Sequence, residues 1–267
     1  MRLILNLKAV SDFSYDNKYY SKFSGFIYSQ LINTPYRFLH EKKGYKFFCF
    51  SNLFPLKIGK IRKVQPFREG ETKFWIISSP DSGLIYVLDK KLEKIKEENS
   101  ILNLGEMRFY LEEVKIAKPT KIKRKLTIKT ETPIIVRIGK KTYERYNVKP
   151  PKNYKYLFWR SKWPLELFIE SLTKNLLNKY KEFYKLKEEE FGELKNKVLP
   201  LFQRLEFNKT LVGHIIIDGK EQKFPCSLWR FHFDWLNSEQ KKLLDFALDS
   251  GFGEKNNYGF GFVNVVD

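Results

Sequence analysis

The order of the predicted strands and helices constrains the fold of this chain more than any other feature. Strand patterns cover residues 2–9, 46–54, 74–79 and 107–116, and helical patterns cover residues 18–32 and 83–96. The resulting β-α-β-β-α-β order is typical of a unit in which two helices cover one face of a four-stranded antiparallel sheet. The sequence therefore predicts an N-terminal ferredoxin-like domain over residues 1–118.

The second half repeats this plan with insertions, after a boundary expected near Pro119. We expect strands at 122–129 and 134–138, which resemble a pair, a hairpin of 205–217 and 224–235 around Asp218 and Gly219, and a final strand at 262–266. Helices are expected at 163–191 and at 237–249, the latter capped by Ser238. Residues 140–162 are predicted to be an exposed loop, either a disordered insertion or a contact for RNA. The fold class is thus α+β, with a second ferredoxin-like domain over residues 119–267.

The net charge of +19 is the first indication of function. Residues 1–120 carry a net +8 and residues 121–267 a net +11, so the excess of cations is not confined to a tail. Such a field attracts polyanions, of which nucleic acid is the obvious candidate. A lysine-rich solubilising surface explains the charge equally well, so motifs are needed to decide.

Cysteine content and apolar runs bear on the compartment. Cys49 and Cys226 are the two cysteines, far apart and within apolar runs, which fits neither a disulfide framework nor a thiolate metal site. The apolar runs are too short for a membrane helix. We predict a soluble cytoplasmic protein that does not associate with membranes.

Residues 251–261 contain four glycines around a polar centre, Gly251, Gly253, Gly259 and Gly261. Glycine permits positive φ and close backbone approach, so we expect amide groups here to face phosphates, with Lys255, Asn256 and Asn257 as side-chain donors. The segment follows a helix and precedes a strand, the reverse of a nucleotide-binding glycine fingerprint. A tight turn would explain one or two of the glycines but hardly all four.

Of the three histidines, His214 and His232 lie in strand-like runs, where a structural role is the ordinary outcome. His40 instead lies in a polar connection after the first helix, where catalytic groups are common. Tyr28 projects away from the apolar side of that helix. Lys46 is expected to begin the next strand, so the three side chains come from consecutive elements.

Tyrosine, histidine and lysine together supply what RNA transesterification needs: a group for the 2′-hydroxyl, a proton for the leaving oxygen and a cation for the phosphate. Asp and Glu are scattered among lysines rather than clustered at metal-ligand spacing, which argues against a two-metal nuclease. We therefore expect no metal ion and no cofactor.

These residues resemble the CRISPR repeat-RNA processing endoribonucleases of the repeat-associated mysterious protein (RAMP) superfamily, over nearly the whole chain. The resemblance is carried by Gly25-Phe-Ile-Tyr28, by residues 38–46, which read Phe-Leu-His-Glu-Lys-Lys-Gly-Tyr-Lys, and above all by the glycine-rich residues 251–263. It implies tandem ferredoxin-like domains, related to the RNA-recognition fold, with RNA bound along a basic surface and cleft.

The resemblance also implies residue roles. Tyr28 would assist the 2′-hydroxyl, His40 would act as general acid or base, and Lys46 would stabilise the transition state. The products would be a 2′,3′-cyclic phosphate and a 5′-hydroxyl. Which of Tyr28 and His40 is the base stays open at this point.

The expected partner is CRISPR precursor RNA. The glycine-rich segment is the first candidate for RNA contact, and weaker candidates are Arg62, Lys63, Lys123, Arg124 and Lys125. The sequence leaves open whether the chain binds RNA as a monomer or a homodimer, and whether it hands its product to a CRISPR effector complex.

Two other functions compete with cleavage. A noncatalytic RNA-binding subunit of an effector complex would keep the glycine-rich segment and the basic surface, although the presence of Tyr28, His40 and Lys46 disfavours it. A small-molecule enzyme on a ferredoxin-like scaffold would need a defined apolar pocket with converging polar groups, which nothing in the sequence marks.

Overall fold

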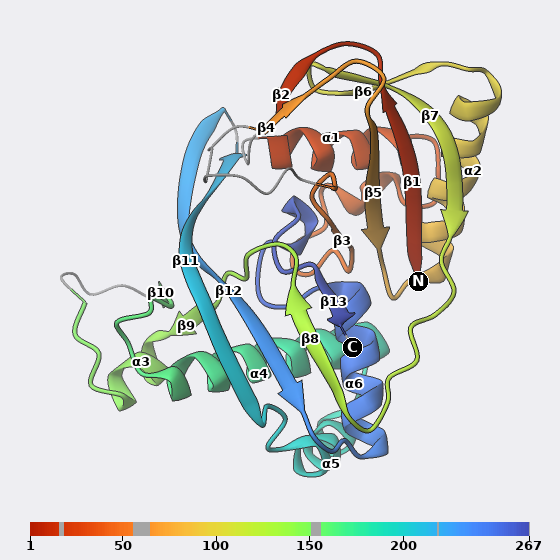
Figure 1. Cartoon of the computed structure of the whole chain (residues 1–267). Helices are drawn as coiled ribbons and strands as arrows, with labels where there is room; N and C mark the ends of the chain where they lie inside the picture. The colour runs from red at the N-terminus through yellow and green to blue at the C-terminus, as the bar shows by residue number, and fades with distance from the viewer. Residues whose placement is uncertain (16–18, 56–64, 151–155, 218, 267) are drawn as a thin grey trace. The chain divides into compact units, whose positions relative to one another are not determined.

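Figure 1 shows the computed structural model of the chain, which describes residues 1–15, 19–55, 65–150, 156–217 and 219–266. The chain divides into two compact units. Unit 1 comprises Met1–Pro119 with two short segments, His214–Gln222 and Asn257–Gly259. Unit 2 comprises Thr120–Gly213, Lys223–Asn256 and Phe260–Asp267.

Unit 1 is built on a five-stranded antiparallel sheet in the order β3-β5-β1-β7-β6 (Figure 1). Its strands are β1 (Arg2–Ala9), β3 (Cys49–Phe50), β5 (Thr72–Ser78), β6 (Ile101–Leu104) and β7 (Met107–Ile116). Leu3, Leu5 and Leu7 of β1 are fully buried, because alternate side chains of a strand point to the same face. The central strand therefore supplies the middle of this unit's core.

Two helices and a small ribbon complete the main part of unit 1. Helix α2 (Ser82–Glu97) packs against β1 and β7, and α1 (Tyr20–Gln30) packs against α2 and β6. The side chain of Asp81 caps α2 by accepting a hydrogen bond from the backbone of Leu84. Strands β2 (Phe13–Tyr15) and β4 (Gln65–Phe67) form a separate antiparallel pair.

Unit 2 is built on a four-stranded sheet in the order β11-β12-β8-β13. Its strands are β8 (Leu126–Thr130), β11 (Arg204–Ile217), β12 (Lys220–Phe233) and β13 (Val263–Val266), of which residues 214–217 and 220–222 belong to unit 1. Three helices, α4 (Leu165–Tyr184), α5 (Glu188–Val198) and α6 (Ser238–Ser250), contribute apolar residues to one buried core. At its centre Phe168 and Trp229 stack with ring centroids 4.3 Å apart, so α4 is fixed on β12 by aromatic contact.

The two sheets share one plan. In unit 1 the strands β1, β3, β5 and β7 lie in the order 2-3-1-4, and in unit 2 the strands β8, β11, β12 and β13 lie in the same order. Helices follow the first strand of each sheet, α1 in unit 1 and α3 (Lys140–Arg145), α4 and α5 in unit 2, and a further helix, α2 or α6, lies between the third of these strands and the last. The predicted tandem ferredoxin-like, α+β architecture is confirmed, with β6 added at one edge of the first sheet.

Some predicted elements of unit 1 were wrong. The strand expected over 46–54 contains only Cys49–Phe50, and it begins late because Phe47 has a left-handed φ of 54°, outside the β region. Lys46 therefore does not begin a strand. The short strand β6 was missed; a turn with Gly105 at a φ of 68° joins it to β7. Residue 18, the predicted start of α1, lies outside the described residues.

Two strand and helix assignments in unit 2 were also wrong. Residues 122–129 and 134–138 do not pair with each other, since β8 pairs with β12 and β13 while Ile134 and Ile135 bridge to Ser227 and Glu254. The single helix predicted over 163–191 is two helices, since Lys185 takes a left-handed φ of 54° between them.

The cap and the loop need correction as well. Asn237, not Ser238, caps α6, accepting from the backbone of Gln240 in a capping box. The predicted loop over 140–162 holds α3 (Lys140–Arg145), and its strand β10 (Tyr156–Phe158) pairs with β9 (Arg137–Gly139). Residues 151–155 of this region lie outside the described residues.

None of the helices in the part of the chain that the structure describes combines the length and apolar composition needed to cross a membrane.

Candidate functional site

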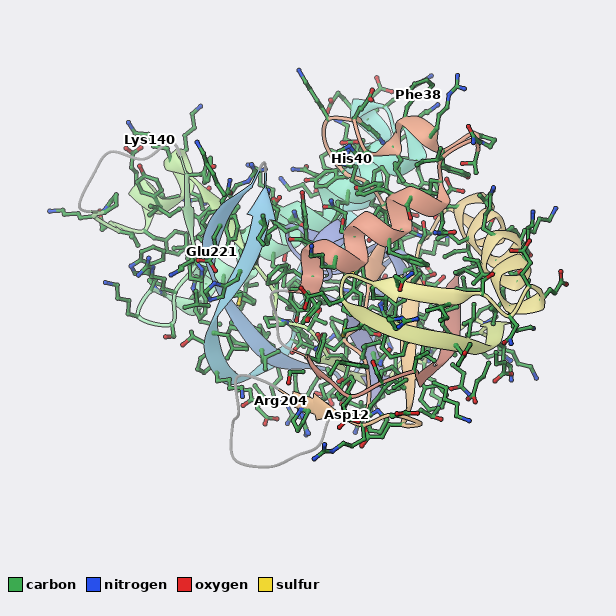
Figure 2. The ribbon with its side chains drawn as sticks, turned by 90° about the horizontal axis from the view of Figure 1, so that it is seen from above. Asp12, Phe38, His40, Lys140, Arg204 and Glu221 are labelled. Carbon is green, nitrogen blue, oxygen red and sulfur yellow. The ribbon has the colours of Figure 1, made fainter. Side chains whose placement is uncertain are left out.

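Tyr28 and His40 lie against each other in unit 1. Tyr28 is near the C-terminal end of α1, and His40 follows a short 3₁₀ helix, Arg37–Leu39. Their rings meet edge to face with centroids 4.8 Å apart, and the buried Phe48 ring meets Tyr28 at 5.6 Å. Figure 2 shows His40 and Phe38 on the segment that follows α1. The sequence prediction that Tyr28 and His40 converge is therefore matched by the geometry.

The hydroxyl of Tyr28 accepts a hydrogen bond from the side-chain amide of Asn257, at 3.2 Å. Asn257 belongs to the segment of the glycine-rich region that is part of unit 1. Burial raises the pKa of Tyr28 well above its usual range, and the Asn257 hydrogen bond opposes only part of that effect. At neutral pH this hydroxyl is protonated, so it can donate a hydrogen bond but is a poor base.

Lys46 contacts backbone rather than the rings of Tyr28 and His40. Its ammonium donates to the carbonyl oxygens of Leu39 at 2.6 Å, of His40 at 2.7 Å and of Lys42. An ammonium has three N–H groups, so these bonds use all of them. Burial lowers the pKa of Lys46, and the neighbouring charge of Lys42 lowers it further. Lys46 thus ties together the segment that carries His40.

A cavity of about 550 Å³ opens beside the Tyr28–His40 pair, and all of its lining residues belong to unit 1. Arg37 and Glu41 supply the charged groups of its lining, and Ser21 and Tyr258 are among its hydroxyl groups. Ser21 also accepts a hydrogen bond from the backbone of Ile216 at 3.0 Å. The cavity therefore offers an imidazole, hydroxyl donors and a guanidinium to one ligand.

The four glycines of residues 251–261 all have positive φ and all are buried. A side chain at Gly261 would place its Cβ 1.9 Å from the carbonyl oxygen of Phe252, and one at Gly253 would meet the carbonyl oxygen of Ile135 at 2.4 Å. Close backbone packing therefore requires glycine at these two positions.

Several backbone N–H groups of this segment donate hydrogen bonds to carbonyl oxygens within unit 2. Phe252 N–H donates to Gly261, Gly261 N–H donates to Pro133, and Glu254 N–H donates to Ile135. The expectation that these amides face a phosphate is wrong for these three. RNA contact by the glycines stays a prediction, but it is not carried by these groups.

The predicted side-chain donors of the segment have different surroundings. Asn256 is buried, and its amide donates to the carbonyls of Phe252 at 3.1 Å and Phe260 at 2.8 Å. Its oxygen accepts from Lys179 at 3.0 Å. Lys255 lies over the ring of Phe224 at 5.7 Å, and burial lowers its pKa. Asn256 thus stabilises the turn, while Lys255 is partly accessible.

The weaker RNA-binding candidates fall into two groups. Lys123, Arg124 and Lys125 are exposed in unit 2, just before β8. Lys123 and Lys125 line a second cavity of about 260 Å³ together with Arg204, although Lys125 also has Asp234 at 4.0 Å. Arg62 and Lys63 lie outside the described residues.

Residues missed by sequence reasoning are Arg37, Tyr258 and Lys179. Arg37 stands three positions before His40, a spacing that brings side chains together on one helical turn and was an available signal. Lys179 gave no signal, because a lysine in a polar helix ordinarily lies at the surface.

His214 and His232 lie on strands, as expected. His214 contacts Glu221 at 2.8 Å, and His232 contacts Glu206 at 3.4 Å.

The fold places the chain in a known class. A solved structure described as CRISPR associated protein Cas6 superposes with a TM-score of 0.71 at 24% identity, covering 100% of this chain and 99% of that chain. Another, described as an RAMP protein binding different RNA substrates, has a TM-score of 0.69 at 18% identity and covers both chains fully. The fold is that of the Cas6 and RAMP proteins.

Sequence comparison goes further. The family model described as CRISPR associated protein Cas6, C-terminal, matches residues 116–265. CRISPR-associated endoribonuclease Cas6 2 of Methanocaldococcus jannaschii is 30% identical over 267 residues and is covered, like this chain, over its full length. CRISPR-associated endoribonuclease Cas6 of Haloferax mediterranei is 26% identical, with 100% of this chain and 94% of the relative covered. This chain belongs to the CRISPR-associated Cas6 family.

Proposed function

We propose that this chain is a CRISPR-associated endoribonuclease that binds CRISPR repeat RNA and cuts the precursor transcript within each repeat. Membership of the Cas6 family supports this, because the full-length relatives in Methanocaldococcus jannaschii and Haloferax mediterranei carry the name endoribonuclease. A net charge of +19 suits a polyanionic substrate.

The observation that carries the proposed mechanism is the contact of Tyr28 with His40 at the edge of one cavity. In the reaction the 2′-oxygen forms a bond to the adjacent phosphorus while the bond from phosphorus to the 5′-oxygen breaks. The 2′-hydroxyl loses a proton and the 5′-oxygen gains one. The products are a 2′,3′-cyclic phosphate and a 5′-hydroxyl.

His40 is the group we assign to proton transfer. It is exposed at the cavity, and an imidazole there can accept or donate a proton as a general base or acid. Tyr28, whose pKa burial raises, keeps its proton and orients the 2′-hydroxyl by hydrogen bonding. Lys46 completes the predicted catalytic set: the resemblance assigns it to stabilising the transition state, and its ammonium donates to the carbonyl oxygen of His40.

The reaction is proposed to run on these side chains without a metal ion. The cavity offers its own proton-transfer group and its own cation, Arg37. Among the described residues, no group of three or more histidine, cysteine or acidic side chains gathers as metal ligands would.

Binding is assigned to both predicted domains. Residues 1–118 carry the cleavage residues, while residues 119–267 bind RNA through Lys255 and through the exposed Lys123, Arg124 and Lys125. A cytoplasmic location, a homodimer and transfer of the product RNA to an effector complex belong to the same proposal.

The test is cleavage of the host's repeat RNA in EDTA by the wild type and by His40→Ala. The variant should cut about 10²- to 10⁴-fold more slowly, the usual contribution of an acid-base group. His214→Ala is the matched control, since His214 is paired with Glu221 and is not among the described residues that line either cavity, and it should cut within a few-fold of the wild type.

Two further arms separate the alternatives. RNA with a 2′-deoxy sugar before the cut should be bound and left whole, and its cleavage would contradict internal 2′-hydroxyl attack. Binding of repeat RNA without cutting by the wild type would favour a noncatalytic RNA-binding subunit. Loss of cutting in EDTA alone would contradict metal independence.

A further inference from the structure

The cavity beside Tyr28 and His40 contains a cation that the predicted catalytic set does not include. Arg37 lines it from the 3₁₀ helix that leads to His40, and the side chain is exposed. Its guanidinium lies over the ring of Phe38, with 4.5 Å from its central carbon to the ring centroid. Stacking of this kind limits the orientations of the guanidinium and leaves its edge N–H groups available.

Lys46, the cation expected to act on the phosphate, is placed differently. Its three N–H groups are donated to the carbonyls of Leu39, His40 and Lys42. It is not among the described residues that line the cavity. To donate to a phosphate, Lys46 would have to break at least one of these hydrogen bonds. The carbonyl released would then lose a hydrogen bond from a charged donor.

The cavity also contains an acidic side chain, which affects how a phosphodiester can bind there. Glu41 lines the same space, and a carboxylate there repels a phosphodiester. Arg37 offsets that charge. A guanidinium also matches two phosphate oxygens at once, which an ammonium does not.

We propose that Arg37, not Lys46, contacts the phosphate at the point of cleavage, and that Lys46 is a positioning residue that keeps His40 against Tyr28. This rests on the proposed function. Arg37 binds the phosphate and stabilises the charge that develops on its oxygens. Lys46 acts only through the backbone of residues 39–42.

The test measures binding and cutting separately. Binding uses repeat RNA with a 2′-deoxy sugar before the cut, titrated over a range of salt concentrations. Loss of one phosphate contact on single-stranded RNA lowers the slope of log Kd against log salt by about 0.7. Arg37→Ala should show that decrease, whereas Lys46→Gln should keep the wild-type slope.

Cutting of the unmodified RNA should fall in both variants. Arg37→Ala should lose about 10²- to 10³-fold in kcat, the usual effect of removing one electrostatic contact to the transition state. Arg37→Lys should recover part of the loss, since it restores charge without the paired donors. Lys46→Gln should lower kcat with Kd for uncut RNA unchanged, and should speed amide hydrogen exchange at residues 39–42.

A sulfur substitution distinguishes the two cations directly. With one non-bridging oxygen of the cut phosphate replaced by sulfur, the wild type should prefer one diastereomer. Arg37→Ala should lose that preference and Lys46→Gln should keep it. Lys91→Ala, which removes an exposed cation from α2 outside the cavity, is the control for net charge.

The outcomes separate this inference from the proposed function. A wild type that does not cut would overturn both. A wild type that cuts while Arg37→Ala keeps its rate, salt slope and sulfur preference would overturn only the role of Arg37. Loss of the sulfur preference and of the salt slope in Lys46→Gln would assign the phosphate to Lys46.

Discussion

Two segments of this molecule are each held by one lysine that donates to three oxygen atoms. In unit 1 Lys46 holds residues 39–42, and in unit 2 Lys179 holds residues 251–256. Lys179 is 1% exposed, whereas Lys46 is half-buried and the His40 segment is exposed. The same set of lysine hydrogen bonds therefore holds a buried turn in unit 2 and an accessible segment in unit 1.

The difference lies in the surroundings of the bonds. Hydrogen bonds away from water are stronger, and leaving their acceptors unpaired there is more unfavourable. Segments that open to bind ligands belong to the less stable parts of a protein. We infer that the glycine-rich turn is scaffold, while the His40 segment is held firmly enough to position an imidazole and still admit RNA.

The largest expected effect is that of Lys179→Met. The substitution keeps most of the volume but leaves the carbonyls of Gly251 and Gly253 and the oxygen of Asn256 without this donor. Because the site is buried, we expect the free energy of unfolding to fall by about 4 kcal/mol, measured by urea denaturation.

Lys46→Met is the matched control for that prediction. It also removes a lysine with three oxygen acceptors, but water can reach the segment, so the loss should be about 1 kcal/mol. If the two variants lost the same free energy of unfolding, the buried hydrogen bonds of Lys179 would be no stronger than the accessible ones of Lys46.

Gly261→Ala should have the next largest effect. Gly261 has a φ of 74°, and the added Cβ would lie 1.9 Å from the carbonyl oxygen of Phe252. The left-handed backbone and the forced displacement together should destabilise the protein by about 3 kcal/mol in the same denaturation experiment.

Gly70→Ala separates the two causes. Gly70 has a similar φ of 75°, but nothing lies within 4 Å of the added Cβ. Its replacement should lose only about 1 kcal/mol, the backbone part alone. If Gly70→Ala lost as much stability as Gly261→Ala, the added Cβ at Gly261 would cause no clash, and the turn around Gly261 would not be tightly packed.

The fold was largely predictable because the decisive patterns are local. Alternation in β1 and the apolar face of α2 both mark a side that must be buried, and their order limits the topology. What failed depended on single backbone angles or on distant partners. Phe47 has a positive φ at the start of the expected strand, so that strand begins only at Cys49, and Ile134 pairs with Ser227 rather than with the neighbouring strand along the chain.

The site was predictable where the type of a residue and its position in an element indicated a catalytic role. A histidine in a polar connection and a tyrosine off the apolar face of its helix indicated the pair that the structure brings together. Arg37 and Lys179 were missed, because a cation in sequence does not reveal whether it is exposed, stacked or buried. Asn257 was predicted as a donor to RNA, and its contact with Tyr28 could not be foreseen across 229 positions.

The smallest expected effect concerns Tyr28. Its hydrogen-bond partner, Asn257, follows Asn256 of the buried glycine-rich turn directly in sequence. Burial raises the folded-state pKa of Tyr28 above the unfolded value of about 10, so the folded state holds its proton more tightly. This stabilisation is complete below pH 10 and is lost as the pH rises above it, because the unfolded chain then binds fewer protons.

Between pH 10 and 11 the wild type should therefore lose about 1 kcal/mol more than Tyr28→Phe, measured as the free energy of unfolding at each pH. Burial and a hydrogen bond to Asp81 also raise the pKa of Tyr36, to about 12, but that group is present in both proteins and cancels. If the two proteins lost stability in parallel, the Tyr28 hydroxyl would be open to water, and its assignment as a protonated hydrogen-bond donor beside His40 would have to be withdrawn.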